Sequence, residues 1–84
     1  MNRFTIIIPI FNETESIFKL IDEIFREFKK ITPEILIIDD GSTDDFQKKL
    51  ESKKLKKIKV YKHKLNLGKC KAMNTGVQKA TNNL

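Results

Sequence analysis

Two short runs of apolar, mostly β-branched residues constrain the fold of this chain more than any other feature. The first is Phe4-Thr5-Ile6-Ile7-Ile8-Pro9 and the second is Glu34-Ile35-Leu36-Ile37-Ile38. Both are nearly continuous rather than alternating, which is typical of strands covered on both faces in a parallel sheet. A third run, Ile58-Lys59-Val60-Tyr61-Lys62, alternates and predicts a more exposed strand.

Helical patterns separate these three runs. After the first run, apolar residues recur at helical spacing until Thr32-Pro33 ends the pattern. Asn12 followed by Glu15 predicts a capping box at the start of this helix. The stripe that should face the core consists of Ile17, Leu20, Ile21, Ile24, Phe25 and Phe28.

Two further helices are expected. Ser42 followed by Asp45 predicts a second capping box, and a short helix with Phe46 and Leu50 facing inward should follow. A third helix is expected over Lys69 to Ala80, after a turn at Asn66-Leu67-Gly68. We expect Cys70, Met73 and Val77 to share one side of it.

Strands that alternate with helices favour parallel pairing through right-handed crossovers, so the fold class is α/β with the order βαβαβα. A chain of 84 residues has room for one small domain, spanning 1–84. We expect the first strand to have an unpaired edge, which would favour self-association.

Charge is unevenly distributed along the chain. Residues 1–45 carry five Lys/Arg and ten Asp/Glu, whereas residues 46–84 carry twelve Lys and one Glu. A solvated lysine-rich face is the simplest interpretation, and an anionic membrane surface or RNA is the alternative. Between Lys48 and Lys71 the chain lacks aromatic stacking partners beyond Tyr61, which disfavours a nucleic-acid partner.

The single cysteine, Cys70, excludes an internal disulfide, and the longest apolar run is far shorter than the roughly 20 residues of a membrane-spanning helix. We therefore expect a cytoplasmic protein, with peripheral contact at the inner face of the membrane left open.

Conspicuous polar residues follow each expected strand. In an open parallel sheet, ligands bind at the carboxyl ends of the strands, where the loops diverge. Two adjacent carboxylates, Asp39 and Asp40, repel each other more than a simple turn requires and therefore indicate function. His63, between Lys62 and Lys64, is expected to be solvated. The three loops supply Pro9, Phe11, Asn12 and Glu13, then Asp39, Asp40, Gly41 and Ser42, then Asn66, Gly68 and Lys69.

Several common sites are missing. The first loop lacks the G-x-G-x-x-G of a dinucleotide site, and Gly68-Lys69 lacks the earlier glycine of a P-loop. The segment from Asp39 does not match a calcium-binding loop. No constellation for nucleophilic catalysis is evident.

Four motifs together resemble those of a known family. They are Thr5-Ile-Ile-Ile-Pro9-Ile-Phe11-Asn12-Glu13, Ile35-Leu-Ile-Ile-Asp39-Asp40-Gly41-Ser42-Thr43-Asp44, Asn66-Leu-Gly68-Lys69 and Asn74-Thr-Gly76. The chain resembles, over its whole length, the amino-terminal half of the family 2 glycosyltransferases. These are inverting enzymes of the Rossmann-like, three-layer GT-A fold, which transfer sugars from nucleotide diphosphate donors.

The resemblance implies a nucleotide site. Pro9, Phe11 and Glu13 would line the base and ribose pocket, and the acidic pair Asp39-Asp40 would hold the nucleoside, with Asp40 accepting a hydrogen bond from the base. Lys69 is similar in position to basic residues that approach the donor diphosphate. The resemblance implies a UDP- or GDP-type sugar as donor.

The chain departs from the family pattern at two points. Phe11 stands where many relatives have Tyr. The D-x-D motif that holds a divalent cation, Mg or Mn, and the later catalytic base are absent from these 84 residues. The resemblance therefore implies a truncated, nucleotide-binding half without ligands for the metal, inactive unless a catalytic half is supplied.

Two alternatives from other classes remain open. Ile35-Leu-Ile-Ile-Asp39-Asp40 is also similar to the acidic strand end of receiver-like signalling domains, although such a pair normally follows the first strand. A basic module that binds membranes or RNA through the lysines from Lys48 to Lys71 is the other.

Overall fold

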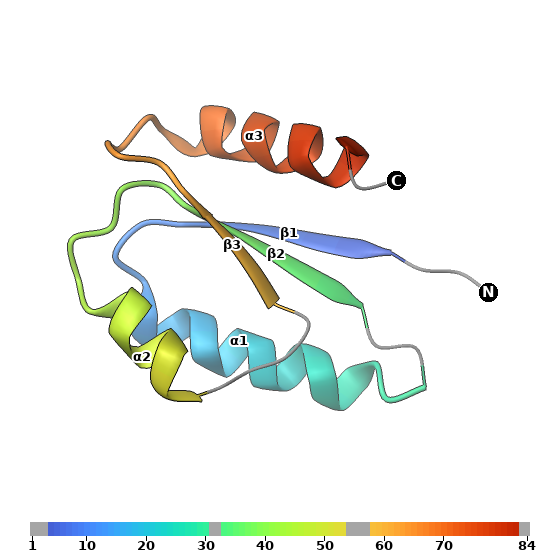
Figure 1. The fold of residues 1–84 in the computed structure, drawn as a ribbon. Coiled ribbons are helices and arrows are strands. Elements are labelled where there is room, and N and C mark those ends of the chain that lie inside the picture. The colour runs from blue at the N-terminus through green and yellow to red at the C-terminus, as the bar shows by residue number, and fades with distance from the viewer. Residues whose placement is uncertain (1–3, 31–32, 54–57, 83–84) are drawn as a thin grey trace.

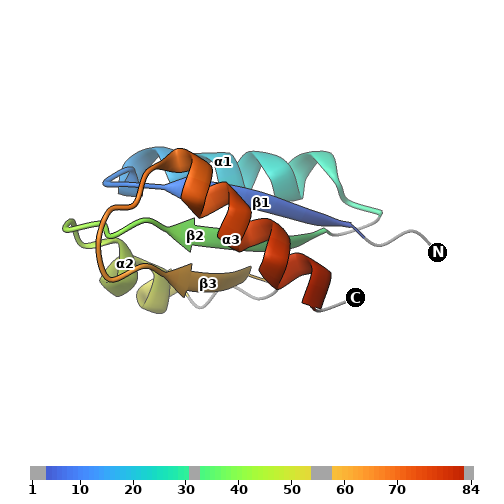
Figure 2. The same ribbon diagram turned by 90° about the horizontal axis from the view of Figure 1, so that it is seen from above.

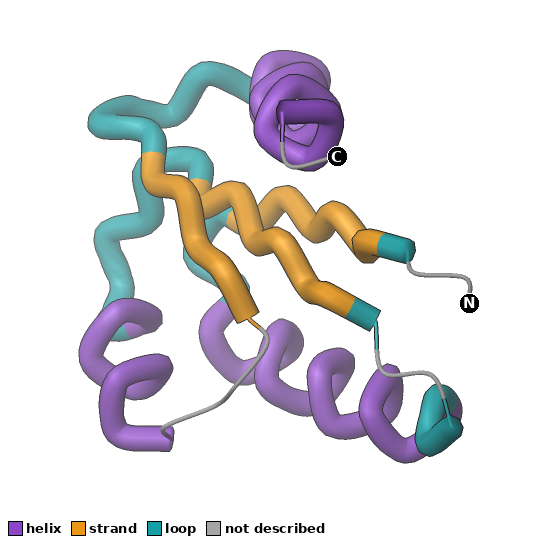
Figure 3. Tube along the Cα trace, turned by 45° about the vertical axis from the view of Figure 1, so that its right-hand side comes forward, coloured by secondary structure: helices purple, strands orange, loops and turns teal. Residues whose placement is uncertain are grey.

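The computed structural model describes residues 4–30, 33–53 and 58–82, and in this part of the chain three parallel strands form one sheet between two layers of helices (Figure 1). Helices α1 and α2 cover one face and α3 covers the other, as the end-on trace also shows (Figure 3). The predicted α/β class and the βαβαβα order are confirmed. The elements are β1 (Thr5–Ile10), α1 (Thr14–Glu27), β2 (Glu34–Asp39), α2 (Phe46–Lys53), β3 (Ile58–Lys62) and α3 (Lys69–Asn82).

The sheet has the order β1-β2-β3, so β2 lies in the middle. Its register pairs Thr5 with Glu34 and Ile10 with Asp39 on one side, and Asp39 with Lys62 on the other. The carboxyl ends of all three strands are therefore level, and their loops open at one edge of the sheet. One residue further along, the same register brings Asp40 beside His63.

The larger core lies between the sheet and the helices α1 and α2. Alternate residues of β2 point into it, and the rings of Phe18 and Phe46 stack with centroids 5.7 Å apart. Burial of these apolar side chains is the main contribution that holds the two helices on the sheet. The buried members of this core are Ile10, Ile17, Phe18, Ile21, Ile35, Ile37 and Phe46.

The predicted core stripe of α1 is only partly right. Ile17 and Ile21 are buried, but Leu20 and Phe28 are about two-fifths exposed. Leu20 lies at the margin of the helical stripe, and Phe28 lies just beyond the end of α1. The sheet covers neither side chain fully. Phe28 packs edge-on against Phe4 instead, with ring centroids 5.3 Å apart.

Small residues dominate the contact between α3 and the opposite face of the sheet. Ala72 is fully buried against Leu36 and Ile38. A Cβ atom at Gly76 would overlap the side chain of Ile7, so only glycine allows the helix to approach this closely. Viewed from above, α3 crosses the sheet diagonally (Figure 2).

The apolar side chains that we expected to share one side of α3 do not face the sheet. Cys70 is exposed, and Met73 and Val77 are 43% and 51% exposed. The sheet-facing positions are taken by the small residues Ala72 and Gly76, which turns the larger side chains outward.

Strand β1 lies at an edge of the described sheet, as expected from the sequence. Its residues from Thr5 to Pro9 are only half-buried, whereas those of β2 from Ile35 to Asp39 are buried. Two strands with similar apolar sequences thus differ in burial because of their place in the sheet. No helix in the described part of the chain is long and apolar enough to cross a membrane.

Candidate functional site

The loops that follow β1 and β2 are joined by Asn12, which has a left-handed backbone with φ of 53°. Its side-chain Oδ1 accepts hydrogen bonds from the N–H groups of Thr43 at 2.8 Å and Asp44 at 3.1 Å. Its own backbone N–H donates to Ser42 Oγ at 2.9 Å. Asn12 therefore holds the second loop rather than the start of α1.

Both predicted capping boxes are wrong for this reason. The residue that precedes α1 is Glu13, which makes no side-chain cap hydrogen bond. Asp44 lies at the start of both helices instead: it accepts from the N–H and hydroxyl of Thr14, the first residue of α1, and from the N–H of Phe46, the first of α2. One carboxylate thus satisfies free N–H groups at two helix N-termini.

The environment of Asp44 favours its charged form. The hydrogen bond from the Thr14 hydroxyl is the largest influence and outweighs the opposing effect of desolvation, so the pKa of Asp44 lies below its ordinary value. The two loops are therefore held together by an ionised carboxylate at neutral pH.

The neighbouring carboxylates Asp39 and Asp40 point to opposite faces of the sheet, because successive residues of a strand alternate. Asp39 is 1% exposed and its Oδ1 accepts the N–H of Ser42 at 2.9 Å, which closes the turn after β2. Asp40 lies on the α3 side. The two carboxylates therefore do not act as one paired site.

Asp40 is buried and accepts three hydrogen bonds. Its Oδ1 accepts from His63 Nδ1 at 2.8 Å and from the N–H of Leu67 at 2.9 Å, and its Oδ2 accepts from the N–H of Gly68 at 2.8 Å. Burial tends to raise the pKa of this carboxyl, but the hydrogen bonds and the nearby His63 outweigh burial and hold the pKa below its ordinary value. Asp40 is therefore ionised at neutral pH and fixes the turn that leads into α3.

His63 is the residue for which the sequence-based expectation fails most clearly. It is 8% exposed rather than solvated, and its second ring nitrogen, Nε2, lies 2.9 Å from Thr75 Oγ1. The available signal was the alternation of Lys59, Tyr61 and His63 along β3 and just beyond it, which places His63 on the same face as Asp40.

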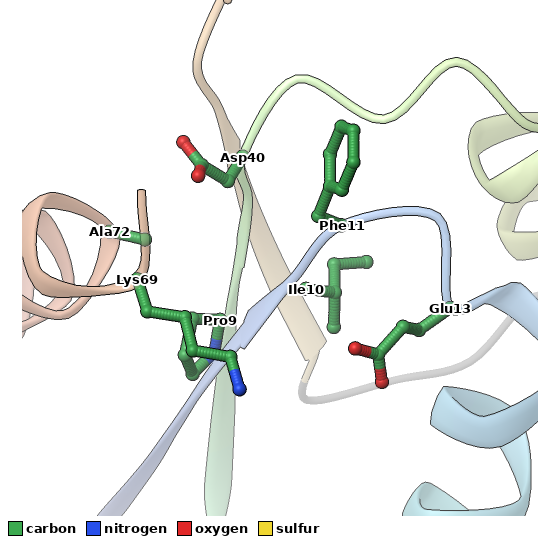
Figure 4. Close-up of a pocket in the computed structure, with 7 residues that line it drawn as sticks. All are labelled: Pro9, Ile10, Phe11, Glu13, Asp40, Lys69 and Ala72. Atoms are coloured by element: carbon green, nitrogen blue, oxygen red, sulfur yellow. The ribbon is translucent and has the colours of Figure 1, made fainter. Parts of the chain in front are cut away.

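Five of the six predicted site residues lie together at the carboxyl edge of the sheet. They line a small hollow of about 30 Å³, in which the Lys69 side chain extends past Pro9 and the Phe11 ring stands on the other side of β1 (Figure 4). Such a volume holds a water molecule but is well below the roughly 300 Å³ of a typical ligand cavity. The residues that line the hollow therefore form an open surface, the wall, rather than an enclosed pocket. The lining consists of Pro9, Ile10, Phe11, Glu13, Asp40, Lys69 and Ala72; Asp39 is not part of it.

A second, wider hollow of about 400 Å³ lies on the other side of Glu13, between the start of α1 and the loop after β2. Its lining includes Glu13, Glu15, Asp44 and Asp45, with Lys49 as the cation. Such an acidic lining repels anions. The first hollow, where Glu13 and Asp40 lie with Lys69, is less acidic and therefore less unfavourable for an anionic ligand.

No group of three or more His, Cys, Asp or Glu side chains that could hold a metal ion occurs among residues 4–30, 33–53 and 58–82. The carboxylates of the site are engaged by backbone N–H groups, His63 and Thr14. These contacts suit a role in holding loops. The divalent cation stays an expectation for longer members of the resembled family.

Comparison with known proteins gives a consistent result. The family described as "Glycosyl transferase family 2" matches residues 5–84. An uncharacterized glycosyltransferase of Rickettsia felis is 39% identical over 79 residues, 93% of this chain and 13% of the relative. An undecaprenyl-phosphate 4-deoxy-4-formamido-L-arabinose transferase of Proteus mirabilis is 34% identical over 53 residues, 61% of this chain and 16% of the relative.

The chain thus spans less than a sixth of the length of these two relatives. The match over almost all of its residues decides against the receiver-like alternative and confirms the resemblance seen in the four motifs. The chain belongs to glycosyl transferase family 2.

Proposed function

We propose that this chain is the nucleotide-binding portion of an inverting glycosyltransferase that uses a nucleotide diphosphate sugar as donor. The observation that carries the proposal is the arrangement of Asp40, Lys69 and Phe11 around one open wall at the carboxyl edge of a parallel sheet. Each offers a different kind of contact, and the three match the parts of such a donor.

Asp40 is suited to the base. A carboxylate has about four lone-pair sites, and the three hydrogen bonds to Asp40 leave one of them, on Oδ2, for a ligand. The imide N–H of uracil or guanine is a donor that this oxygen can accept. In the proposal, Pro9 and Phe11 supply an apolar wall for the base, and Glu13 accepts a hydrogen bond from a ribose hydroxyl.

Lys69 is suited to the diphosphate. It is the first residue of α3, a helix of 14 residues, so its side chain begins beside the free N–H groups and the partial positive charge of the helix N-terminus. Its exposed side chain extends along the wall. A cation and backbone donors at one place favour a dianionic group.

In the complete reaction, an acceptor hydroxyl would attack the anomeric carbon and the nucleoside diphosphate would leave. The base, the acceptor site and the ligands for Mg or Mn would come from a catalytic half outside these 84 residues. We therefore expect nucleotide binding by this chain and no turnover by it alone. The proposal also includes a cytoplasmic location, with peripheral contact at the inner face of the membrane.

The test is titration of UDP, GDP and dTDP into the folded chain by calorimetry, with two variants that differ only in where a lysine is lost. Lys69→Gln removes the ammonium at the wall, and Lys71→Gln removes an exposed ammonium from the same turn of α3, outside the wall. We expect about tenfold weaker binding for Lys69→Gln and no change for Lys71→Gln.

Phe11→Ala, which removes a side chain that is 43% exposed, should weaken the binding of nucleotides but not the binding of pyrophosphate. The proposal is wrong if well-folded protein binds no nucleotide, or if the two lysine variants bind equally well.

A further inference from the structure

We infer that His63 is a positioning residue that sets which oxygen of Asp40 faces the nucleotide base, and thereby sets the selectivity for bases with an N–H donor. The inference rests on the proposed nucleotide site and adds to it a residue outside the wall. His63 lies behind Asp40, bonded to it and to Thr75.

The direction of the His63–Asp40 hydrogen bond follows from the charge of Asp40. An ionised carboxylate can only accept, so Nδ1 of His63 carries the proton in this contact. The ring cannot turn away easily, because its other nitrogen is held by Thr75 of α3 and its backbone N–H donates to the carbonyl of Asp39 at 2.8 Å. His63 thus connects the ends of β2 and β3 with α3.

The two oxygens of Asp40 are made unequal by this contact. Oδ1 accepts from His63 and from Leu67, which fills both of its lone-pair sites, whereas Oδ2 accepts from Gly68 alone. Without the His63 donor, Oδ1 would also have a free site, and only the N–H groups of Leu67 and Gly68 would hold the carboxylate. The ring therefore leaves one acceptor in one direction for a ligand.

A purely structural role for His63 predicts something different. A buried imidazole with both nitrogens satisfied also stabilises the fold, and in that case any substitution that loses one hydrogen bond would act through stability alone. The two roles differ in which nitrogen matters, because only Nδ1 contacts Asp40.

The experiment uses two variants that each keep one half of the ring's contacts. In His63→Asn, the side-chain amide nitrogen takes the place of Nδ1 and can donate to Asp40. In His63→Gln, it takes the place of Nε2 and reaches toward Thr75 instead. Each variant loses the ring and one of two hydrogen bonds, so urea unfolding should show similar losses of stability.

We expect His63→Asn to bind UDP within about twofold of the parent and His63→Gln to bind it about tenfold more weakly. Pyrophosphate, which has no base, should bind equally to all three proteins. The inference would be overturned if the two variants fold and bind UDP equally well. It would also be overturned if His63→Gln lost as much affinity for pyrophosphate as for UDP. A folded parent that bound no nucleotide would instead overturn the proposed function itself.

A measurement on the parent covers the case in which neither variant folds. His63 is the only histidine of the chain, so its ring nitrogens give unambiguous ¹⁵N NMR signals. Saturating UDP should shift the Nδ1 signal, because the base then shares the Asp40 carboxylate, while saturating pyrophosphate should leave it in place. A signal that does not respond to bound UDP contradicts the inference.

Discussion

The backbone N–H of Asn12 donates a hydrogen bond to Ser42 Oγ across 30 residues of sequence. The Asn12 side chain accepts two N–H groups from the same loop, so one residue fixes the distance between the ends of β1 and β2. Its left-handed backbone, with φ of 53°, aims the amide at that loop.

Asn12→Gly should therefore destabilise the protein less than Asn12→Ala. Both changes remove the hydrogen bonds that the side chain accepts, but alanine adds the strain of a left-handed backbone, about 1 kcal/mol, which glycine does not have. Free energies of unfolding from urea titration check this order. An alanine variant as stable as the glycine variant would show that Asn12 does not keep this conformation.

Gly76→Ala should destabilise the protein by about 1–3 kcal/mol, because the new methyl group overlaps Ile7 and forces α3 away from the sheet. The sign is informative, because alanine normally stabilises a helix interior by about 1 kcal/mol relative to glycine. Val77→Ala, one residue further and 51% exposed, is the control and should change stability by less than about 0.5 kcal/mol. Unfolding in urea measures both, and a stabilised Gly76→Ala would refute the close packing.

Acid should destabilise the protein through Asp40 and Asp44. Both carboxyls have pKa values below the ordinary one in the folded state, so the folded protein binds fewer protons than the unfolded chain. Their contribution to stability is complete above the unfolded pKa of about 3.9 and is lost as the pH falls through the lower folded pKa. The free energy of unfolding, measured from pH 6 downward, should therefore decline below about pH 4.

Asp44→Asn should be less stable than the parent at neutral pH. It should also lose less stability on acidification, because it lacks one of the two carboxyls whose pKa is lowered by folding. Asp45→Asn is the matched control, since the Asp45 carboxylate forms an exposed ion pair with Lys49, at 3.7 Å, and accepts no hydrogen bond from the described residues. If the two variants have the same acid dependence, Asp44 does not contribute as described.

The open edge of β1 should allow the chain to self-associate. Half-buried isoleucines and unpaired backbone groups at an edge favour pairing with another strand. Sedimentation velocity should show a concentration-dependent larger species, and Thr5→Lys, which adds a charge to the edge strand, should reduce it. Thr43→Lys, in the exposed loop after β2, adds the same charge outside the strand and should not. A parent that is monomeric at every concentration would exclude this association.

Much of the fold could be predicted because the hydrophobic pattern and the sheet period agree. The runs at Thr5 and Glu34 became strands, and the alternation from Ile58 to Lys62 became β3 with the expected bounds. The prediction for α3 was less complete, since it identified the helix but not that its sheet-facing side consists of Ala72 and Gly76. Small residues carry little hydrophobic signal, although they decide how closely a helix approaches a sheet.

The sequence indicated which candidate residues lie close together, but it did not indicate their hydrogen bonds. Strand ends and motif resemblance were enough to bring Pro9, Phe11, Glu13, Asp40 and Lys69 to one wall. The contacts of Asn12, Asp44 and His63 were missed, because local capping rules consider only the next few residues. In the structure each of these side chains has at least one partner 12 to 32 residues away, whose position depends on the register of the sheet.

The hydrogen bonds of Asn12, Asp44, Asp40 and His63 have a consequence for how the protein assembles. The loops after β1 and β2 hold each other, and the loop after β3 is held from β2, so none of the three has its native conformation before the strands are paired. The wall at the carboxyl edge should therefore be a late product of folding. A substitution in any one loop should then raise the hydrogen-exchange rates of backbone amides in the others.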